Sequence, residues 1–373
     1  MFSPTRKSPL VSFFVALVCF SAVAAEVNAS PMLPGGLVSV RSLTTASTAH
    51  YSVTDLCPLP GDVCGVGRGS GLFFALGGSL NSLGQASGIS SNNSALNFAT
   101  LFNHGQTRDL NSLGAAISYG DAINASGEVA GWESMPSETP HHAFLYTNGR
   151  MMNIENASLF PNGSEAYGIN KTGQVVGIGF ITPGNFHAFL YTGGKMVDLN
   201  PFNGFQSIAT SINDAGEIIG SSCCSPLAKT WLYANGNFTN LSQTNSGTFI
   251  NNNGQIVGQN SAQHATLYSN GVWTDLGAFQ GNATAANEIN NKGQVVGFAF
   301  IRSRNHHCPS CPPPDDNRAL IFTSGGPVDL NTLIPPSSGF TLTEAIAIND
   351  AGQIVADAKN GSDVPHAVLL TPK

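Results

Sequence analysis

The sequence predicts an all-β fold: a single closed β-propeller of seven or eight four-stranded blades, in which an N-terminal strand completes the last blade. Three observations support this prediction. The chain has 42 Gly and 21 Pro among 373 residues but only 10% charged residues, which is typical of short strands joined by tight turns. One four-stranded unit recurs along the chain. The two ends of the repeat region each carry a part of one unit.

Residues 1–25 have the pattern of a secretory signal peptide. Arg6 and Lys7 give a positive start, an apolar run follows at 10–23, and small alanines follow the run. The run is short for a membrane span. We therefore expect the mature protein to be secreted, periplasmic or at the cell surface, and not to span the membrane after signal cleavage.

The repeat domain is expected at 51–373, after a linker at 26–50. The first half of its unit is an apolar residue and Asn, a short turn, Gly, Gln or Glu, and an apolar, mostly Val/Ile, pair. This pattern predicts a β-hairpin whose Asn caps the turn and whose Gly has a positive φ, where a Cβ would be strained. A degenerate copy, GISSNNSAL, begins at Gly88. The glycines of the six clear copies are Gly127, Gly173, Gly216, Gly254, Gly293 and Gly352.

The second half of each unit supplies two more strands. One reads HAFLYT or a variant of it, and the next ends in Asp-Leu or a relative. Four strands per unit and copies 38 to 59 residues apart match the blades of a β-propeller. The widest interval contains a loop insertion at 302–317. The number of blades stays open, because residues 72–83 resemble the last two strands of an eroded eighth unit.

The two ends of the domain predict that the ring is closed. The last unit stops at Lys373 without a fourth strand, whereas the segment YSVTDL at 51–56 reads as a fourth strand that no first three precede. Pairing these two segments completes a blade and removes two free sheet edges. An open solenoid would need polar caps at its ends instead.

Together, the motifs INxxGxVVG and HAFLY resemble those of the HAF-repeat family of extracellular proteins. The His-Ala-Phe triplet occurs at 142–144 and 187–189, and the likeness covers nearly all of the chain after residue 51. Departures occur at Lys229, at Arg318 and in the first unit. The resemblance implies a repeat fold and export, and it implies no shared activity or catalytic residue.

One position of the third strand carries a basic side chain in six consecutive units. In a closed ring these side chains would lie at a similar height and radius, which predicts a site for an anionic or polyhydroxyl ligand. Its histidines would be charged only below about pH 6.5. The alternative is that each side chain hydrogen-bonds a neighbouring blade and sets the register of the ring. The six residues are His142, His187, Lys229, His264, Arg318 and His366.

Six cysteines follow the signal peptide, and an even count in an exported protein indicates disulfides. The candidate pairs are Cys57 with Cys64 and Cys308 with Cys311. The second pair follows His306 and His307, so this insertion is also a candidate Zn²⁺ site. A single CxxC motif without a second pair, together with export, favours the disulfide. We expect no resident metal or cofactor.

Two turns carry an acid directly after the Asn, at Asp214 and Asp350, which suggests Ca²⁺ binding. The same position holds Lys171, Asn252 and Asn291 in other units, and the alternating oxygen ligands of a Ca²⁺ loop are missing. A simple Asx-turn is the better interpretation.

The predicted function is that of a binding or scaffolding module. The formal net charge of −7 argues against a nucleic acid partner, and no catalytic motif stands out. The expected ligand is a carbohydrate, a cell-envelope component or another protein. Two alternatives remain: a carbohydrate-active hydrolase or lyase, and a structural surface-layer protein. The enzyme would need two acids or histidines in the central cleft, some with perturbed pKa values.

Overall fold

Most of the repeat domain is described by the computed structural model. The predicted signal peptide, the linker at 26–50 and all but the last residue of the insertion at 302–317 lie outside the described residues. Those residues are 51–57, 63–66, 79–91, 97–103, 105–110, 117–134, 140–200, 206–222, 229–242, 245–301 and 317–373.

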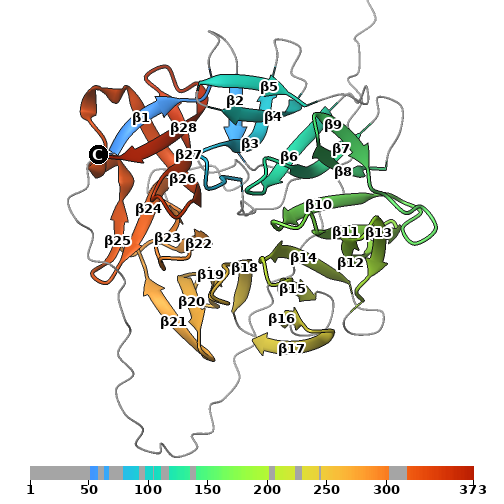
Figure 1. Ribbon diagram of the computed structural model, residues 1–373. Helices are drawn as coiled ribbons and strands as arrows, with labels where there is room; N and C mark the ends of the chain where they lie inside the picture. The colour runs from blue at the N-terminus through green and yellow to red at the C-terminus, as the bar shows by residue number, and fades with distance from the viewer. Residues whose placement is uncertain are drawn as a thin grey trace, which may run out of the picture.

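Seven four-stranded antiparallel sheets stand as blades around a central axis (Figure 1). This confirms the predicted all-β closed β-propeller, and the number of blades is seven. In blades 1 to 6 the strands follow one another in chain order from the axis outwards. Between blades 6 and 7 lie two short 3-10 helices, η1 (Leu330–Leu333) and η2 (Pro336–Ser338). The described residues contain no helix that is long and apolar enough to cross a membrane.

The strands of each blade are as follows. Blade 1 has β2 (Val63–Val66), β3 (Ala86–Ser91), β4 (Asn97–Asn103) and β5 (Gln106–Asp109). Blade 2 has β6 (Ile117–Ile123), β7 (Val129–Ser134), β8 (His142–Thr147) and β9 (Arg150–Asn153). Blade 3 has β10 (Ser164–Ile169), β11 (Val175–Thr182), β12 (Asn185–Thr192) and β13 (Lys195–Asp198). Blade 4 has β14 (Ser207–Ile212), β15 (Ile218–Ser222), β16 (Lys229–Ala234) and β17 (Asn237–Ser242).

The remaining three blades complete the ring. Blade 5 has β18 (Ser246–Ile250), β19 (Ile256–Gln259), β20 (Ala265–Ser269) and β21 (Val272–Gly277). Blade 6 has β22 (Thr284–Ile289), β23 (Val295–Ala299), β24 (Arg318–Thr323) and β25 (Gly326–Asp329). Blade 7 has β26 (Phe340–Ile348), β27 (Ile354–Asn360), β28 (Pro365–Pro372) and, as its outermost strand, β1 (Tyr51–Asp55).

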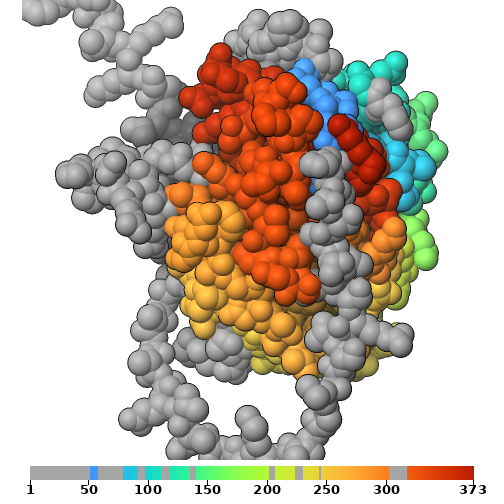
Figure 2. Space-filling view, turned by 90° about the vertical axis from the view of Figure 1, so that its left-hand side faces the viewer, coloured from blue at the N-terminus to red at the C-terminus, as the bar shows by residue number. Residues whose placement is uncertain are grey.

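The closing strand β1 lies where the two ends of the domain predict it. It pairs antiparallel with β28, with Tyr51 opposite Pro372 and Asp55 opposite Val368. Figure 2 shows β1, in blue, beside the C-terminal strands in red. Blade 7 is therefore assembled from both ends of the domain, and the predicted closure is confirmed.

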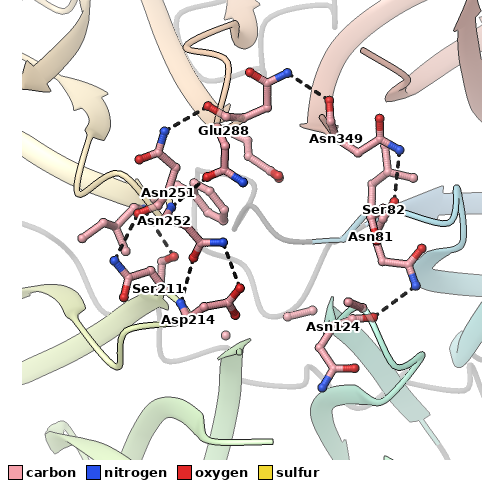
Figure 3. Close-up of a pocket in the computed structure, with 18 of the residues that line it drawn as sticks. Asn81, Ser82, Asn124, Ser211, Asp214, Asn251, Asn252, Glu288 and Asn349 are labelled. Atoms are coloured by element: carbon pink, nitrogen blue, oxygen red, sulfur yellow. Dashed lines mark hydrogen bonds between the residues drawn. The ribbon is translucent and has the colours of Figure 1, made fainter. Parts of the chain in front are cut away.

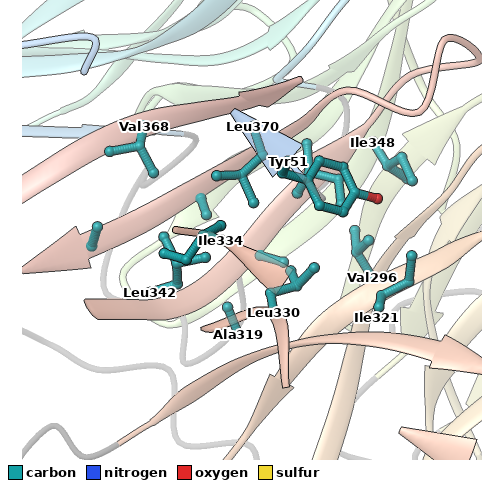
Figure 4. Packing of buried hydrophobic residues seen from close by; sticks show 14 residues of the cluster. Tyr51, Val296, Ala319, Ile321, Leu330, Ile334, Leu342, Ile348, Val368 and Leu370 are labelled. Carbon is teal, nitrogen blue, oxygen red and sulfur yellow. The ribbon is translucent and has the colours of Figure 1, made fainter. Parts of the chain in front are cut away.

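The hydrophobic core lies in layers between adjacent blades. The layer between blades 6 and 7 joins Tyr51 of β1, Leu370 of β28 and Ile321 of β24 in one buried cluster (Figure 4). Tyr51 is only 4% exposed. Because buried apolar surface stabilises by about 25 cal/mol per Å², β1 is held by this packing as well as by its backbone hydrogen bonds.

A β-bulge recurs in the innermost strand of blades 2 to 7, three residues before the Asn of the turn. A glycine of the second strand faces the residue before the bulge in blades 2 to 6, which explains the Gly that ends the VVG motif. A Cβ at any of these glycines would lie 1.6 to 2.2 Å from a carbonyl oxygen of the innermost strand, so a side chain does not fit. The bulge residues are Asp121, Tyr167, Thr210, Thr248, Asn287 and Ile346. The facing glycines are Gly131, Gly177, Gly220, Gly258 and Gly297.

Blade 1 corrects the predicted position of the seventh hairpin. Its turn is at 81–85, with Gly84 at φ 76°, whereas Gly88 lies in the second strand opposite Val66. The innermost strand is split: β2 pairs with the outer part of β3, and Leu80 forms a separate bridge with Ala86. Residues 67–78 come between these two parts, which hides the repeat. The segment 79–83 therefore belongs to blade 1 and not to an eighth blade.

Candidate functional site

Seven asparagines, one from each blade, meet around the central axis. Each side-chain Nδ2 donates a hydrogen bond to the backbone carbonyl of the equivalent asparagine in the next blade, at 2.9 to 3.1 Å. The bond from Asn349 of blade 7 to Asn81 of blade 1 closes the circle (Figure 3). We call this set the asparagine ring: Asn81, Asn124, Asn170, Asn213, Asn251, Asn290 and Asn349.

The side chains of the asparagine ring use all of their hydrogen-bonding capacity. In blade 4, Asn213 Oδ1 accepts from the backbone N–H groups of Ala215 and Glu217, both at 3.0 Å. Its second Nδ2 hydrogen goes to the Glu217 carboxylate at 2.7 Å. The same pattern, with Gln or Glu as the last partner, occurs in every blade. The ring asparagines thus cap the turns and close the ring, and their side chains have no capacity left for a ligand.

Glycine completes each of these turns. Gly216 adopts φ 79° and donates its N–H to the Asn213 carbonyl at 3.0 Å. All six glycines predicted for this position have positive φ, as does Gly84, which the prediction missed. The motif Asn-x-x-Gly-Gln/Glu is therefore explained by one turn that every blade repeats.

The residue that follows each ring asparagine lines the mouth of a cavity of 310 Å³ on the axis (Figure 3). Glu288 and Phe249, from the ends of innermost strands, also line this cavity. Unlike the ring asparagines, the following residues differ in chemistry from blade to blade. We call them the mouth ring: Ser82, Ala125, Lys171, Asp214, Asn252, Asn291 and Asp350.

Hydrogen bonds join the mouth residues of blades 3 to 7. The backbone N–H of one blade donates to the side-chain oxygen of the next: Lys171 to Asp214 at 2.9 Å, Asp214 to Asn252 at 2.8 Å, Asn252 to Asn291 at 3.0 Å, and Asn291 to Asp350 at 2.8 Å. Asn252 Nδ2 also donates to Asp214, and Asn291 Nδ2 to Asp350, both at 2.9 Å. The two acids therefore bridge blades, whereas the preceding asparagines make the predicted Asx-turns.

The predicted column of basic residues lies on the third strands, except that His264 directly precedes its strand. The structure describes the side chains of five of these residues. Each of the five lies beside an acid of its own blade, located on the outermost strand or just after that strand. None of the five lines the cavity. The acid partner of each histidine is therefore in its own blade, and the ligand site and the contact with a neighbouring blade both stay predictions. The side chain of Lys229 is outside the described part of the chain. The pairs are His142–Glu155, His187–Asp198, His264–Asp275, Arg318–Asp329 and His366–Asp55.

The pair in blade 7 has a cysteine beside it. Cys57 is a free thiol, 6% exposed, and its Sγ lies within 4.8 Å of ligand atoms of Asp55 and His366. Asn360 is oriented by two backbone N–H groups that donate to its Oδ1, and its Nδ2 faces His366 Nε2 at 3.1 Å. His366 Nδ1 then carries the proton toward Asp55 at 3.1 Å. The two ring nitrogens thus contact Asn360 of β27 and Asp55 of the closing strand β1.

The other cysteine predictions fall where the structure describes no side chains. They concern Cys64, and the insertion residues His306, His307, Cys308 and Cys311. The predicted Cys57–Cys64 disulfide is not formed in the structure, where Cys57 is a free thiol. The Cys308–Cys311 disulfide and the alternative Zn²⁺ site stay predictions.

Two buried carboxyl groups have raised pKa values, and neither lines the cavity. Burial, together with the nearby Glu165, raises the pKa of Asp121 well above its usual value of 3.8. Both oxygens of Asp121 lack a hydrogen-bond partner. Burial also raises the pKa of Glu133, although His142 opposes the shift.

Asn287 is the bulge residue of blade 6, the position that Asp121 holds in blade 2. Its Nδ2 donates to Glu344 Oε1 at 3.1 Å and to the Ala345 carbonyl at 2.9 Å. Blade 3 presents Glu165 at the position of Glu344 in blade 7. A protonated Asp121 is thus placed to serve as a hydrogen-bond donor like the amide of Asn287.

No protein-family model matches the chain, and no curated protein does, so the resemblance to the HAF-repeat family stays a prediction. Among solved structures, the chain is similar to the β-propeller domain of the Trilobed protease from Pyrococcus furiosus. The TM-score is 0.53 at 9% identity, over 79% of this chain and 92% of that chain. That domain has an open velcro topology, whereas here β1 closes blade 7.

TolB from Acinetobacter baumannii is a second similar structure. The TM-score is 0.42 at 9% identity, over 78% of this chain and 79% of that chain. The similarity to the Trilobed protease domain shows a β-propeller fold and nothing finer.

Sequence reasoning noticed Asp214 and Asp350 but missed the mouth ring as a set. The signal that could have found it is the alignment of the hairpins. In that alignment the Asn is constant and the next residue changes from blade to blade.

Proposed function

We propose that this protein is an exported β-propeller that binds its ligand at the mouth of the axial cavity, in contact with the mouth ring. The observation that carries the proposal is the contrast between two consecutive positions. Asn occupies the first position in all seven blades, while the second position holds five residue types: Ser, Ala, Lys, Asp and Asn. A position that served only to close the ring would have no reason to vary in this way.

The chemistry of the mouth suits a polar ligand. The cavity of 310 Å³ falls within the range of about 300–1,000 Å³ for small-molecule sites. Amides, carboxylates and one lysine surround it, and most of these side chains reach the solvent. With the predicted export, this favours a carbohydrate or an envelope component as the ligand.

The alternative of a hydrolase or lyase would need two acids that converge in this cavity. Asp214, Glu288 and Asp350 line it from blades 4, 6 and 7, and Asp214 and Asp350 each accept hydrogen bonds from a neighbouring asparagine. The carboxyl groups with raised pKa values are not among the residues that line the cavity. Binding is therefore the better supported function.

Glycan-array binding by the exported protein and two tryptophan variants tests the proposal. Ala125→Trp fills the mouth, whereas Val272→Trp places the same side chain on the outermost strand of blade 5, where Val272 is 62% exposed. We expect the wild-type protein and Val272→Trp to bind the same glycans, and Ala125→Trp to lose them. Equal binding by all three proteins would contradict the proposed site, and failure of the wild-type protein to bind any glycan or envelope fraction would contradict the proposed ligand.

We propose that the basic residues of the third strands hold the outermost strands rather than a ligand. His187 Nδ1 lies 2.9 Å from Asp198, and His264 Nδ1 lies 3.0 Å from Asp275. A double change of His187 and His264 to Gln should lower the melting temperature and leave glycan binding unchanged. Lost binding at an unchanged melting temperature would instead support the predicted ligand site.

A further inference from the structure

The chain of hydrogen bonds in the mouth ring stops part-way around the axis. In blades 3 to 6 the backbone N–H of the mouth residue donates to the side-chain oxygen of the next mouth residue, at 2.8 to 3.0 Å. This series of hydrogen bonds begins at Lys171 and ends at Asp350. It does not continue through blades 1 and 2.

The residue types explain why the chain stops. Each bond needs a short side chain with an oxygen on the next blade. The N–H of Ser82 would meet Ala125, which has no side-chain oxygen, and the N–H of Ala125 would meet Lys171, which has only a donor. The N–H of Asp350 would meet the Ser82 hydroxyl, but that bond is not formed. Within the described part of the chain, these three N–H groups have no hydrogen-bond acceptor.

The three N–H groups should point as the four bonded ones do. The turns of all seven blades are alike, because each has the same asparagine cap and a glycine at φ 72° to 80°. In blades 3 to 6 an oxygen of Asp or Asn fills the place in front of the N–H. In blades 7, 1 and 2 no such oxygen of the described residues is bonded there, and the three residues line the cavity. Backbone N–H groups that have no partner in the protein can donate hydrogen bonds to oxygen atoms of a ligand.

The surrounding charges decide which kind of oxygen fits. Asp214, Glu288 and Asp350 line the same cavity, and Lys171 is the one basic residue among the described residues that line it. Lys171 Nζ already lies 3.9 Å from Asp214. An anion would meet more negative than positive charge here. A hydroxyl group accepts a hydrogen bond from an N–H and also donates one to a carboxylate, so it suits both parts of the site.

We infer that a polyhydroxyl ligand, such as one sugar residue of a glycan, binds in the sector formed by Asp350, Ser82 and Ala125. Its oxygens accept hydrogen bonds from the three backbone N–H groups, and one of its hydroxyls donates to the Asp350 carboxylate. That carboxylate accepts one bond at each oxygen from Asn291 and has capacity for more. The inference rests on the proposed function and adds the chemistry of the ligand and its place in the mouth.

The variant Ala125→Asn tests this inference because it supplies the missing acceptor. Asn occupies the same position in blades 5 and 6, so the turn accommodates it, and its Oδ1 would accept from Ser82 N–H as Asn252 does from Asp214. We expect a higher melting temperature and at least tenfold weaker sugar binding. The matched control is Val272→Asn, which places the same side chain on the outermost strand of blade 5, where Val272 is 62% exposed, and should keep sugar affinity within about twofold of the wild type.

Titration calorimetry or saturation-transfer NMR with glucose, galactose, mannose and N-acetylglucosamine, and separately with sulfate, gives the readout. Sugar binding that is lost in Ala125→Asn and kept in Val272→Asn supports the inference. Binding of sulfate without any sugar, or wild-type affinity in Ala125→Asn, overturns it. If Ala125→Trp abolishes glycan binding while Ala125→Asn does not, this inference fails and the proposed function survives. If neither variant changes binding, both fail.

Discussion

Asn213 and Asp214 are consecutive residues of one turn, yet they have different structural roles. Asn213 is 3% exposed, and its side chain is fully used in capping its own turn and in reaching the next blade. Asp214 is half-buried, bonds to mouth residues on both sides, and stands at an open cavity. The difference teaches that ring closure and recognition are separated at neighbouring positions of each repeat. The first position can therefore stay constant while the second varies.

The largest expected effect is the loss of a ring asparagine. Asn213→Ala removes four hydrogen bonds and leaves buried backbone groups without partners, which should cost about 3–5 kcal/mol. Urea denaturation measures this loss in the free energy of unfolding. A cost below about 1 kcal/mol would show that the asparagine ring does not hold the blades together.

A slightly smaller loss of stability is expected when a glycine of the second strand is replaced. In Gly177→Ala the new Cβ would lie 1.9 Å from the Glu165 carbonyl oxygen, so the backbone must shift, at about 2–3 kcal/mol. Ala356→Gly is the matched control, because blade 7 already carries an alanine at this position and has a second register shift in its innermost strand. The control should cost less than 1 kcal/mol or so. Equal stability of Gly177→Ala and wild type would contradict the steric explanation.

The buried Asp121 predicts a pH effect that the mouth ring should not show. Since its pKa is raised in the folded protein, the folded state binds the proton more tightly than the unfolded state does. Stability is then lost as the pH rises from the ordinary pKa of Asp through the raised value. Asp121→Asn should remove this loss, so that the variant melts higher than wild type near pH 8 and equally near pH 4.

Asn287→Asp is the control for that measurement, because it places a carboxyl group at the equivalent bulge of blade 6. It should introduce a similar loss of stability with rising pH. Parallel melting curves for wild type and Asp121→Asn across this range would show that Asp121 is not held protonated.

The smallest effect is expected in the mouth ring itself. Asn252 is exposed, and Asn252→Ala removes hydrogen bonds that water can replace, so the cost should stay below about 1 kcal/mol. Urea denaturation beside Asn213→Ala gives the direct comparison of the two rings. If both changes cost the same, the separation of closure from recognition is wrong.

The architecture could be predicted because its signals are local in sequence. The hairpin motif, the HAFLYT strand and the unpaired strand at 51–56 each identify an element directly, and β1 pairs with β28 as those elements required. The predicted position of the blade 1 hairpin is wrong because residues 67–78 separate the two parts of its innermost strand. The turn at Asn81 therefore lacks the sequence pattern of a strand directly before it.

The site was harder to predict because its contacts join residues of different blades. The bond from Asn213 to the Asn251 carbonyl spans 38 residues, and only the closed ring brings the two together. The basic residues share a strand position, as predicted, but that position faces an acid of the outer strand, which strand alignment alone does not reveal.

Backbone amide chemical shifts test the central claim most directly. In a ¹⁵N-labelled protein titrated with the sugar that binds best, the amides of Ser82, Ala125 and Asp350 should shift most. The amides of Asp214, Asn252 and Asn291, which are already hydrogen-bonded, should shift less. Shifts confined to the outer strands, or larger shifts in the bonded sector than in the three free amides, would contradict the account.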